Sequence, residues 1–163
     1  MINTANKLNS GVKKYSKKNG LFWFTNDLRI HDNPALASAA RSVDTLVCVY
    51  CLESKWFTPN RFGSISLGQR RQQFLEESLH SLQRELAKLN QKLIIVKGLS
   101  GSSIETLINE FQISHVFRSR NAGLNEKKVW QTLTATLHHV DFSEVDSHTL
   151  FDLDRLPCDV HAL

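Results

Sequence analysis

Polar side chains that could bind a ligand follow directly after the first apolar run of the sequence, residues 21–24. The loop after this run supplies amide, carboxylate, guanidinium and imidazole groups: Asn26, Asp27, Arg29, His31, Asp32 and Asn33. Such groups could bind a polar ligand through hydrogen bonds. Asp27, Arg29 and Asp32 could equally pair with one another and cap the helix that follows. Both interpretations of this loop remain open from the sequence.

Redox, metal and nucleotide chemistry receive little support. Cys48 and Cys51 form a C-x-x-C pattern inside an apolar run, where an odd separation turns the two thiols to opposite faces of a strand. We therefore expect buried core cysteines instead of a redox pair. The residues that could ligate a metal are His138, His139, Glu144, Asp146 and His148. Their spacing matches no site at which three side chains converge, so we predict no metal site. The glycine-rich dinucleotide fingerprint and the P-loop are both absent, and no catalytic residue can be nominated.

Alternating apolar runs and amphipathic stretches must position these loops. The predicted strands lie at residues 21–24, 45–51, 93–96, 115–118 and 140–145. The predicted helices lie at residues 35–41, 66–90, 102–111 and 125–137. This alternation predicts an α/β fold: a Rossmann-like, doubly wound, five-stranded parallel sheet with helices on both faces. Ligands of such sheets bind at the carboxyl ends of the strands, which selects residues 25–32, the loop after the second strand, and residues 119–125.

Local patterns predict where the helices begin and which face each one buries. Asn33 followed by Pro34 predicts an N-cap and a first helical residue. Two further helices are predicted to start with capping boxes, in which each side chain satisfies the other's free backbone N–H. The capping pairs are Ser66 with Gln69, and Ser102 with Glu105. In the longest helix, leucines at helical spacing predict a stripe against the sheet: Leu75, Leu79, Leu82, Leu86 and Leu89.

The net charge of +4 comes from the first 19 residues, which hold five lysines and no acid. The other 15 of the 20 basic residues are matched by 16 acidic ones, so the domain itself does not indicate a nucleic-acid-binding surface. We expect residues 1–19 to be a disordered basic tail. Three cysteines, no signal-peptide stretch and no apolar run long enough to cross a membrane predict a cytoplasmic protein.

One segment carries specific information about the family. Residues 21–36 read Leu-Phe-Trp-Phe-Thr-Asn-Asp-Leu-Arg-Ile-His-Asp-Asn-Pro-Ala-Leu. This ungapped run closely resembles the opening of the DNA photolyase and cryptochrome family, in which Trp-Phe, Asn-Asp-Leu-Arg and Asp-Asn-Pro-Ala-Leu follow in this order. Residues 74–79 are similar to the family's Phe-Leu-x-x-Ser-Leu helix, and residues 149–157 resemble the start of the linker in the cryptochrome-DASH branch. Thr25 departs from the family, where arginine is common at this position.

The resemblance implies that residues 20–147 form an N-terminal antenna domain and that residues 148–163 begin an interdomain linker. Such a domain holds a pigment, which is a folate (methenyltetrahydrofolate) or in some members a deazaflavin or flavin, and passes excitation to FAD. FAD lies in a larger helical domain, which we expect to be missing from these 163 residues. The parent protein would split cyclobutane pyrimidine dimers in DNA or act as a photoreceptor, and this chain alone would not.

Two pigment-binding residues are implied by the same resemblance. Folate-binding members carry an Asn-Glu pair in the loop that opens the helix after strand four, and Asn125-Glu126 stands in that position. The two side chains could equally serve the helix, Asn125 as its N-cap and Glu126 as an acid of the first turn. An aromatic ring that precedes the pair in some members is replaced by Ala122-Gly123-Leu124. The other functional interpretation is a free-standing α/β module that binds a small ligand or a protein.

Overall fold

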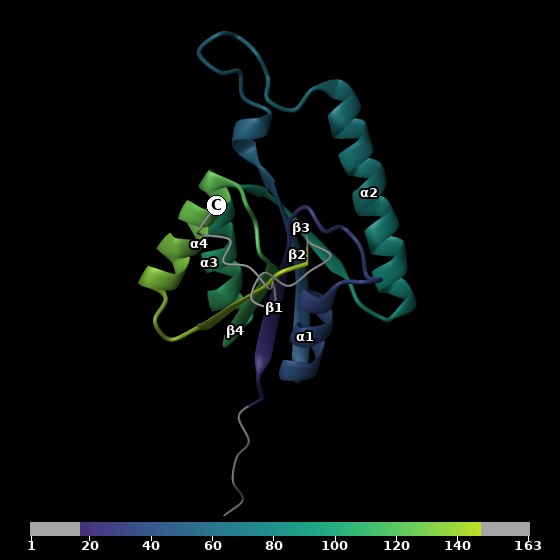
Figure 1. The fold of residues 1–163 in the computed structure, drawn as a ribbon, viewed down its shortest axis with the longest axis vertical. Coiled ribbons are helices and arrows are strands. Elements are labelled where there is room, and N and C mark those ends of the chain that lie inside the picture. The colour runs from purple at the N-terminus through teal and green to yellow at the C-terminus, as the bar shows by residue number, and fades with distance from the viewer. Residues whose placement is uncertain (1–16, 148–163) are drawn as a thin grey trace, which may run out of the picture.

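A five-stranded sheet runs through the centre of the computed structural model, which describes residues 17–147 (Figure 1). The strands are β1 (Asn19–Phe24), β2 (Thr45–Glu53), β3 (Leu93–Gly98), β4 (His115–Ser119) and β5 (Asp141–Val145). The helices are α1 (Pro34–Ser42), α2 (Gln69–Lys88), α3 (Ser100–Glu110) and α4 (Leu124–Thr136), with a 3-10 turn, η1 (Ser54–Trp56), after β2. None of these helices has the length and apolar character needed to span a bilayer.

The order of the strands produces a crevice at which a ligand can bind. The sheet order is β3-β2-β1-β4-β5, and every pairing is parallel. The chain moves outward from β1 through β2 to β3, and then returns to place β4 on the other side of β1. The chain therefore changes direction at β1, which makes the carboxyl ends of β1 and β4 a topological switch point. The predicted doubly wound, five-stranded parallel sheet is confirmed.

Helices cover both faces of the sheet and bury two separate cores. On β1, Leu21 and Trp23 pack with α3 and α4, whereas Phe22 and Phe24 pack with α1 and α2. Figure 1 shows the two helix pairs on opposite sides of the strands. Because both faces of β1 are buried, its sequence is a continuous apolar run instead of an alternating one.

The first helix begins as predicted, and the second does not. Asn33 Oδ1 accepts a hydrogen bond from the backbone N–H of Leu36 at 3.0 Å, so Asn33 caps α1. The capping box predicted for Ser66 and Gln69 is wrong. Helix α2 begins at Gln69 itself, after Gly68, and no side chain caps it. Ser66 lies too far before the first turn to reach the free N–H groups of the helix.

The capping box predicted for Ser102 and Glu105 is also wrong, because α3 begins two residues earlier. Its N-cap residue is Leu99, which has no side-chain oxygen to offer. The first backbone N–H of the helix, at Ser100, donates instead to Glu53 Oε1 at the end of β2, at 3.2 Å. A cap supplied from another element therefore replaces the local pair.

The leucine stripe of α2 is confirmed over most of its length. Leu79, Leu82 and Leu86 are buried in the core shared with α1, and Leu75 is partly buried against it. Leu89 was expected to complete the stripe, but it is 58% exposed because the helix ends one residue earlier. The stripe holds the C-terminal half of α2 on the sheet.

The two ends of the described region bear on the predicted domain boundaries. Strand β1 begins at Asn19, and the backbone of Lys18 already exchanges hydrogen bonds with Asp44. The rest of the predicted basic tail, residues 1–16, and the predicted linker, residues 148–163, lie outside the described residues. The tail and the linker therefore stay predictions.

Candidate ligand-binding cleft

The loops that follow β1, β2 and β4 meet at the carboxyl edge of the sheet and enclose a cleft. Its deeper cavity, of about 50 Å³, lies among the ends of these strands and is lined by Thr25, Tyr50 and Arg118 among others. An outer cavity of about 500 Å³ lies between η1, the segment before α2 and the first turns of α2 and α4. All three segments selected from the sequence as candidate ligand-binding loops therefore contribute residues to the lining of this one cleft.

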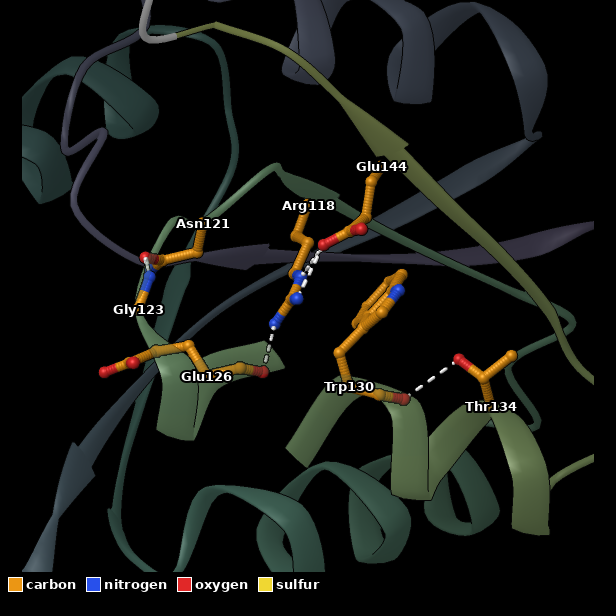
Figure 2. Close-up of polar contacts among 7 residues, drawn as sticks. All are labelled: Arg118, Asn121, Gly123, Glu126, Trp130, Thr134 and Glu144. Atoms are coloured by element: carbon orange, nitrogen blue, oxygen red, sulfur yellow. Dashed lines mark hydrogen bonds and ion pairs between the residues drawn. The ribbon is translucent and has the colours of Figure 1, made fainter. Parts of the chain in front are cut away.

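The predicted pair Asn125 and Glu126 lies in the first turn of α4 and lines both cavities. The N-cap of α4 is Gly123, so the alternative role of Asn125 as the N-cap is wrong. The Glu126 carboxylate folds back over Gly123 so closely that a β-carbon at that glycine would overlap it. A carboxylate in this position is stabilised by the positive end of the helix dipole. Figure 2 shows this carboxylate pointing away from the Arg118 guanidinium.

The reasoning from sequence missed Arg118, a β4 residue that is only 1% exposed. Its Nε donates a hydrogen bond to Glu144 Oε1 on β5 at 2.7 Å, and its Nη1 donates to the backbone carbonyl of Glu126 at 3.2 Å (Figure 2). The guanidinium carbon also lies 4.1 Å from the ring centre of Trp130 and 5.6 Å from that of Trp23, within the range of cation–π attraction. Arg118 thus connects β4, β5 and α4 beneath the cleft.

Burial lowers the pKa of the Arg118 guanidinium, and the hydrogen bond and charge of Glu144 oppose that shift. Arginine nevertheless stays protonated in proteins, so this site contains a buried positive charge that needs its counterion. A charged residue next to Val116 and Phe117 in a strand predicted to be buried is the signal that could have drawn attention to Arg118. The partner carboxylate lies 26 residues away in the sequence and could not have been identified.

The polar loop after β1 is held mainly by a buried carboxylate. Asp27 is 1% exposed and accepts hydrogen bonds from the backbone N–H of Thr25 at 3.2 Å, Asn33 Nδ2 at 3.1 Å and Ser119 Oγ at 2.5 Å. Arg29 donates to backbone carbonyls instead of to a carboxylate. The ion pairs expected among Asp27, Arg29 and Asp32 are therefore not found in the described region, and none of the three caps α1, whose cap is the separately predicted Asn33.

The two cysteines of β2 are buried on opposite faces of the strand, as predicted, one in each core. Burial raises the pKa of Cys48 to about 11. Burial, with a smaller contribution from the nearby Glu53 carboxylate, raises that of Cys51 to about 12. Both thiols stay protonated at neutral pH, so neither is a ready nucleophile or metal ligand. Among residues 17–147, no three histidine, cysteine or acidic side chains gather to hold a metal; His148 lies outside that range.

A doubly wound α/β domain with a cleft at its switch point belongs to the class of domains that bind small ligands at the edge of a sheet. Comparison with known proteins identifies the family. The family model described as DNA photolyase matches residues 20–160. Cryptochrome DASH from Idiomarina loihiensis is 36% identical over 138 residues, which cover 85% of this chain and 31% of that protein. The chain belongs to the DNA photolyase and cryptochrome family and corresponds to its N-terminal α/β domain.

Solved structures agree with this assignment. A cryptochrome from Synechocystis sp. PCC6803 superposes with a TM-score of 0.81 at 27% identity, over 89% of this chain and 30% of that one. An archaeal photolyase from Sulfolobus tokodaii, solved with two FAD molecules, has a TM-score of 0.74 at 17% identity, over 85% of this chain and 31% of that one; this likeness shows the fold alone. The chain thus spans about a third of the length of these relatives. The family resemblance read from the sequence is confirmed, and the free-standing module is not favoured.

Proposed function

We propose that this chain is the light-harvesting domain of a photolyase or cryptochrome and that its cleft binds an antenna pigment. The observation that carries the proposal is the position of Asn125 and Glu126, which line both cavities at the switch point of the sheet. An amide and a carboxylate together offer both acceptors and donors. They suit the amino group and ring nitrogens of a pterin, the coloured part of methenyltetrahydrofolate.

The size and lining of the cleft support a ring-shaped ligand. The outer cavity, about 500 Å³, falls within the range of about 300–1,000 Å³ that is common for small-molecule sites. Trp56 lines both cavities and is half-buried, so its ring offers a face on which a fused ring can stack. The deeper cavity, at about 50 Å³, accommodates only an edge group of the pigment. We propose methenyltetrahydrofolate as the pigment, and a flavin is the other ring system that suits this description.

The parent protein supplies the chemistry in this proposal. Because the chain spans about a third of its relatives, we propose that a helical FAD-binding domain is its partner and receives excitation from the pigment. The parent, a cytoplasmic protein in this proposal, would use light to split cyclobutane pyrimidine dimers in DNA or to signal. The 163 residues alone should show no turnover of a dimer-containing oligonucleotide under illumination, and any turnover would contradict this division of labour.

The binding role of Glu126 is tested by titrating methenyltetrahydrofolate into the 163-residue chain and following pigment fluorescence. We expect Glu126→Ala to weaken binding about tenfold, the effect of losing a hydrogen bond to a charged group. Glu110→Ala, which removes an exposed carboxylate at the far end of α3, is the matched control and should bind as the unaltered chain does. Equal affinity of both variants would assign Glu126 to the helix instead of to the pigment.

A further inference from the structure

A second hollow in the surface of the domain lies between α3 and α4, which run side by side (Figure 1). Its cavity of about 310 Å³ is open to solvent, and we refer to it as the α3–α4 groove. The buried side chains of Leu133 and Leu137 form its floor. Exposed residues form its walls, among them Ser102 from α3 and Thr132 from α4. The groove therefore leaves part of an apolar core accessible from outside.

The exposed surface of α4 beside this groove carries little charge. Its charged residues Glu126, Lys127 and Lys128 all lie in the first two turns, and residues 129–136 include none. Five residues of that uncharged stretch are nevertheless exposed: Gln131, Thr132, Thr134, Ala135 and Thr136. A helix that faces water normally has charged residues on its exposed side. An uncharged exposed face next to an apolar floor indicates a surface that another part of the protein covers.

The shape of the α3–α4 groove restricts what can cover it. Two copies of the domain placed groove against groove would present one hollow to another, and neither would fill the floor of its partner. Protein interiors are closely packed and contain few voids, so the occupant must project into the groove. A single segment of chain that carries apolar side chains at short intervals has the required shape.

The residues that follow β5 in the sequence have this composition. Their apolar side chains recur every one to four residues: Leu150, Phe151, Leu153, Leu156 and Val160. The family model matches the chain up to residue 160, thirteen residues past Ser147, the last residue described. The segment is thus matched as part of the same domain as the sheet.

The chain leaves the sheet close to the start of the groove. Strand β5 lies against α4, and the ring centre of Phe142 is 5.1 Å from that of Trp130. Because α3 and α4 each follow a parallel strand, both helices begin at the carboxyl edge of the sheet, where β5 ends. Thirteen extended residues span about 43 Å, whereas the 13 residues of α4 span about 20 Å. The segment can therefore run along the whole groove.

The charges of the segment complement those beside the groove. Glu105 of α3 and Lys128 of α4 line it from opposite sides, and neither side chain forms an ion pair with a described residue. The segment carries Asp152, Asp154 and Arg155, which offer a partner of opposite sign to each. Exposed pairs of this kind add little affinity but favour one orientation of the segment over the other.

We propose that residues 149–160 pack into the α3–α4 groove, with their apolar side chains over Leu133 and Leu137 and their acids near Lys128. The chain then leaves the domain along the face formed by α3 and α4, and the rest of the protein continues from there. This inference concerns a surface outside the ligand-binding cleft and holds whether or not a pigment binds.

Cys158 provides a natural attachment point for a spin label in this segment. Because Cys48 and Cys51 are buried and protonated, the label reacts with Cys158 alone in the folded 163-residue chain. A spin label broadens the amide NMR signals of residues near it. We expect loss of the signals of Ser102 and Thr132, relative to the same chain with the label reduced, and none on α1 and α2, which cover the other face. Loss confined to α1 and α2, or no loss at all, would overturn the proposal.

A pair of matched variants tests whether the groove itself holds the segment. Thr132→Arg places a long cation on the wall of the groove and should restore the signals of α3. Thr134→Arg adds the same charge to the same helix at an exposed position that does not line the groove, and should leave the loss unchanged. Leu153→Asp changes the segment alone and should restore the signals as Thr132→Arg does. Thermal unfolding confirms that each variant is folded, and an equal result for Thr132→Arg and Thr134→Arg would contradict docking in the groove.

Mixed samples show whether the segment comes from the same chain. A spin-labelled chain without isotope is mixed with an isotope-labelled Cys158→Ser chain, so that only contact between copies can broaden a signal. We expect no loss of signal in this mixture. Loss on α3 and α4 would show that the groove holds the segment of a second copy, and it would overturn docking within one chain.

Discussion

Removing Glu144 from its ion pair with Arg118 should destabilise the domain more than breaking an exposed surface pair, because Arg118, the charge that would remain, is almost completely buried. The Arg118 side chain is 1% exposed and the Glu144 side chain 25% exposed, and their closest atoms are 2.5 Å apart. Replacing Glu144 by alanine would leave the guanidinium with a carbonyl contact, two aromatic rings and the weaker influence of the Glu126 carboxylate, but with no carboxylate in direct contact.

The expected magnitude follows from that burial. Removing one member of a fully buried pair costs about 3–5 kcal/mol, because the remaining charge keeps its desolvation penalty. Since a quarter of the Glu144 side chain reaches solvent, we expect the lower end for Glu144→Ala, about 3 kcal/mol. Replacing both residues, with Arg118→Met and Glu144→Ala, removes the buried charge altogether and should be less destabilising than Glu144→Ala alone.

Urea unfolding followed by tryptophan fluorescence measures this effect directly, because Trp23 and Trp130 flank the guanidinium. With a slope of about 2 kcal/mol per molar urea, a loss of 3 kcal/mol lowers the midpoint by about 1.5 M. Glu85→Ala, which breaks the exposed pair with Lys88, is the control and should leave the midpoint almost unchanged. A Glu144→Ala midpoint as high as that of the control would refute the counterion argument.

Two further predictions concern the cores and the first helix. Because burial raises the pKa of Cys48 to about 11 and of Cys51 to about 12, the folded chain keeps protons that the unfolded chain releases near pH 9. The stability that these two thiols contribute should therefore be constant below about pH 9 and fall as the pH rises toward 12. When the third cysteine of the sequence is also replaced, by Cys158→Ser, no thiol should react with Ellman's reagent at pH 8 until urea unfolds the chain. Asn33→Ala removes the hydrogen bond that Asn33 accepts from the backbone N–H of Leu36, together with those that it donates to Asp27 and Arg29, and should cost at least about 1–2 kcal/mol in urea unfolding. A loss below about 0.3 kcal/mol would contradict the capping role.

The parts of the fold that could be predicted are those in which a local sequence pattern by itself determines which side chains are buried or capped. An apolar run such as residues 21–24 is buried on both faces of a parallel sheet, so its composition already indicates its place. The same reasoning placed Cys48 and Cys51 on opposite faces, because the side chains of a strand alternate whatever surrounds them. Asn33 was read correctly since a side-chain cap acts within three residues of its own helix.

The parts that could not be predicted depend on contacts between distant segments. Ser102 and Glu105 formed a good local pattern for a helix start, yet α3 begins at Ser100, where Glu53 from β2 accepts the free N–H. That partner is 47 residues away, and no window of sequence contains both groups. Arg118 was passed over for the same reason, since its importance comes from a carboxylate on another strand.

Glu126 shows why a residue type in the right position does not by itself settle a role. Its carboxylate lies over Gly123 at the positive end of α4, where it stabilises the helix, and the same side chain lines the cleft, where it could bind a pigment. These two roles affect different free energies. Stabilising α4 lowers the free energy of the folded chain, whereas binding a pigment lowers the free energy of the complex. A Glu126→Ala chain that unfolds at lower urea but binds normally would show the helix role alone. A Glu126→Ala chain that unfolds at the same urea concentration but binds the pigment weakly would show the pigment role alone. Loss of both stability and affinity would mean that the one carboxylate stabilises the helix and binds the pigment.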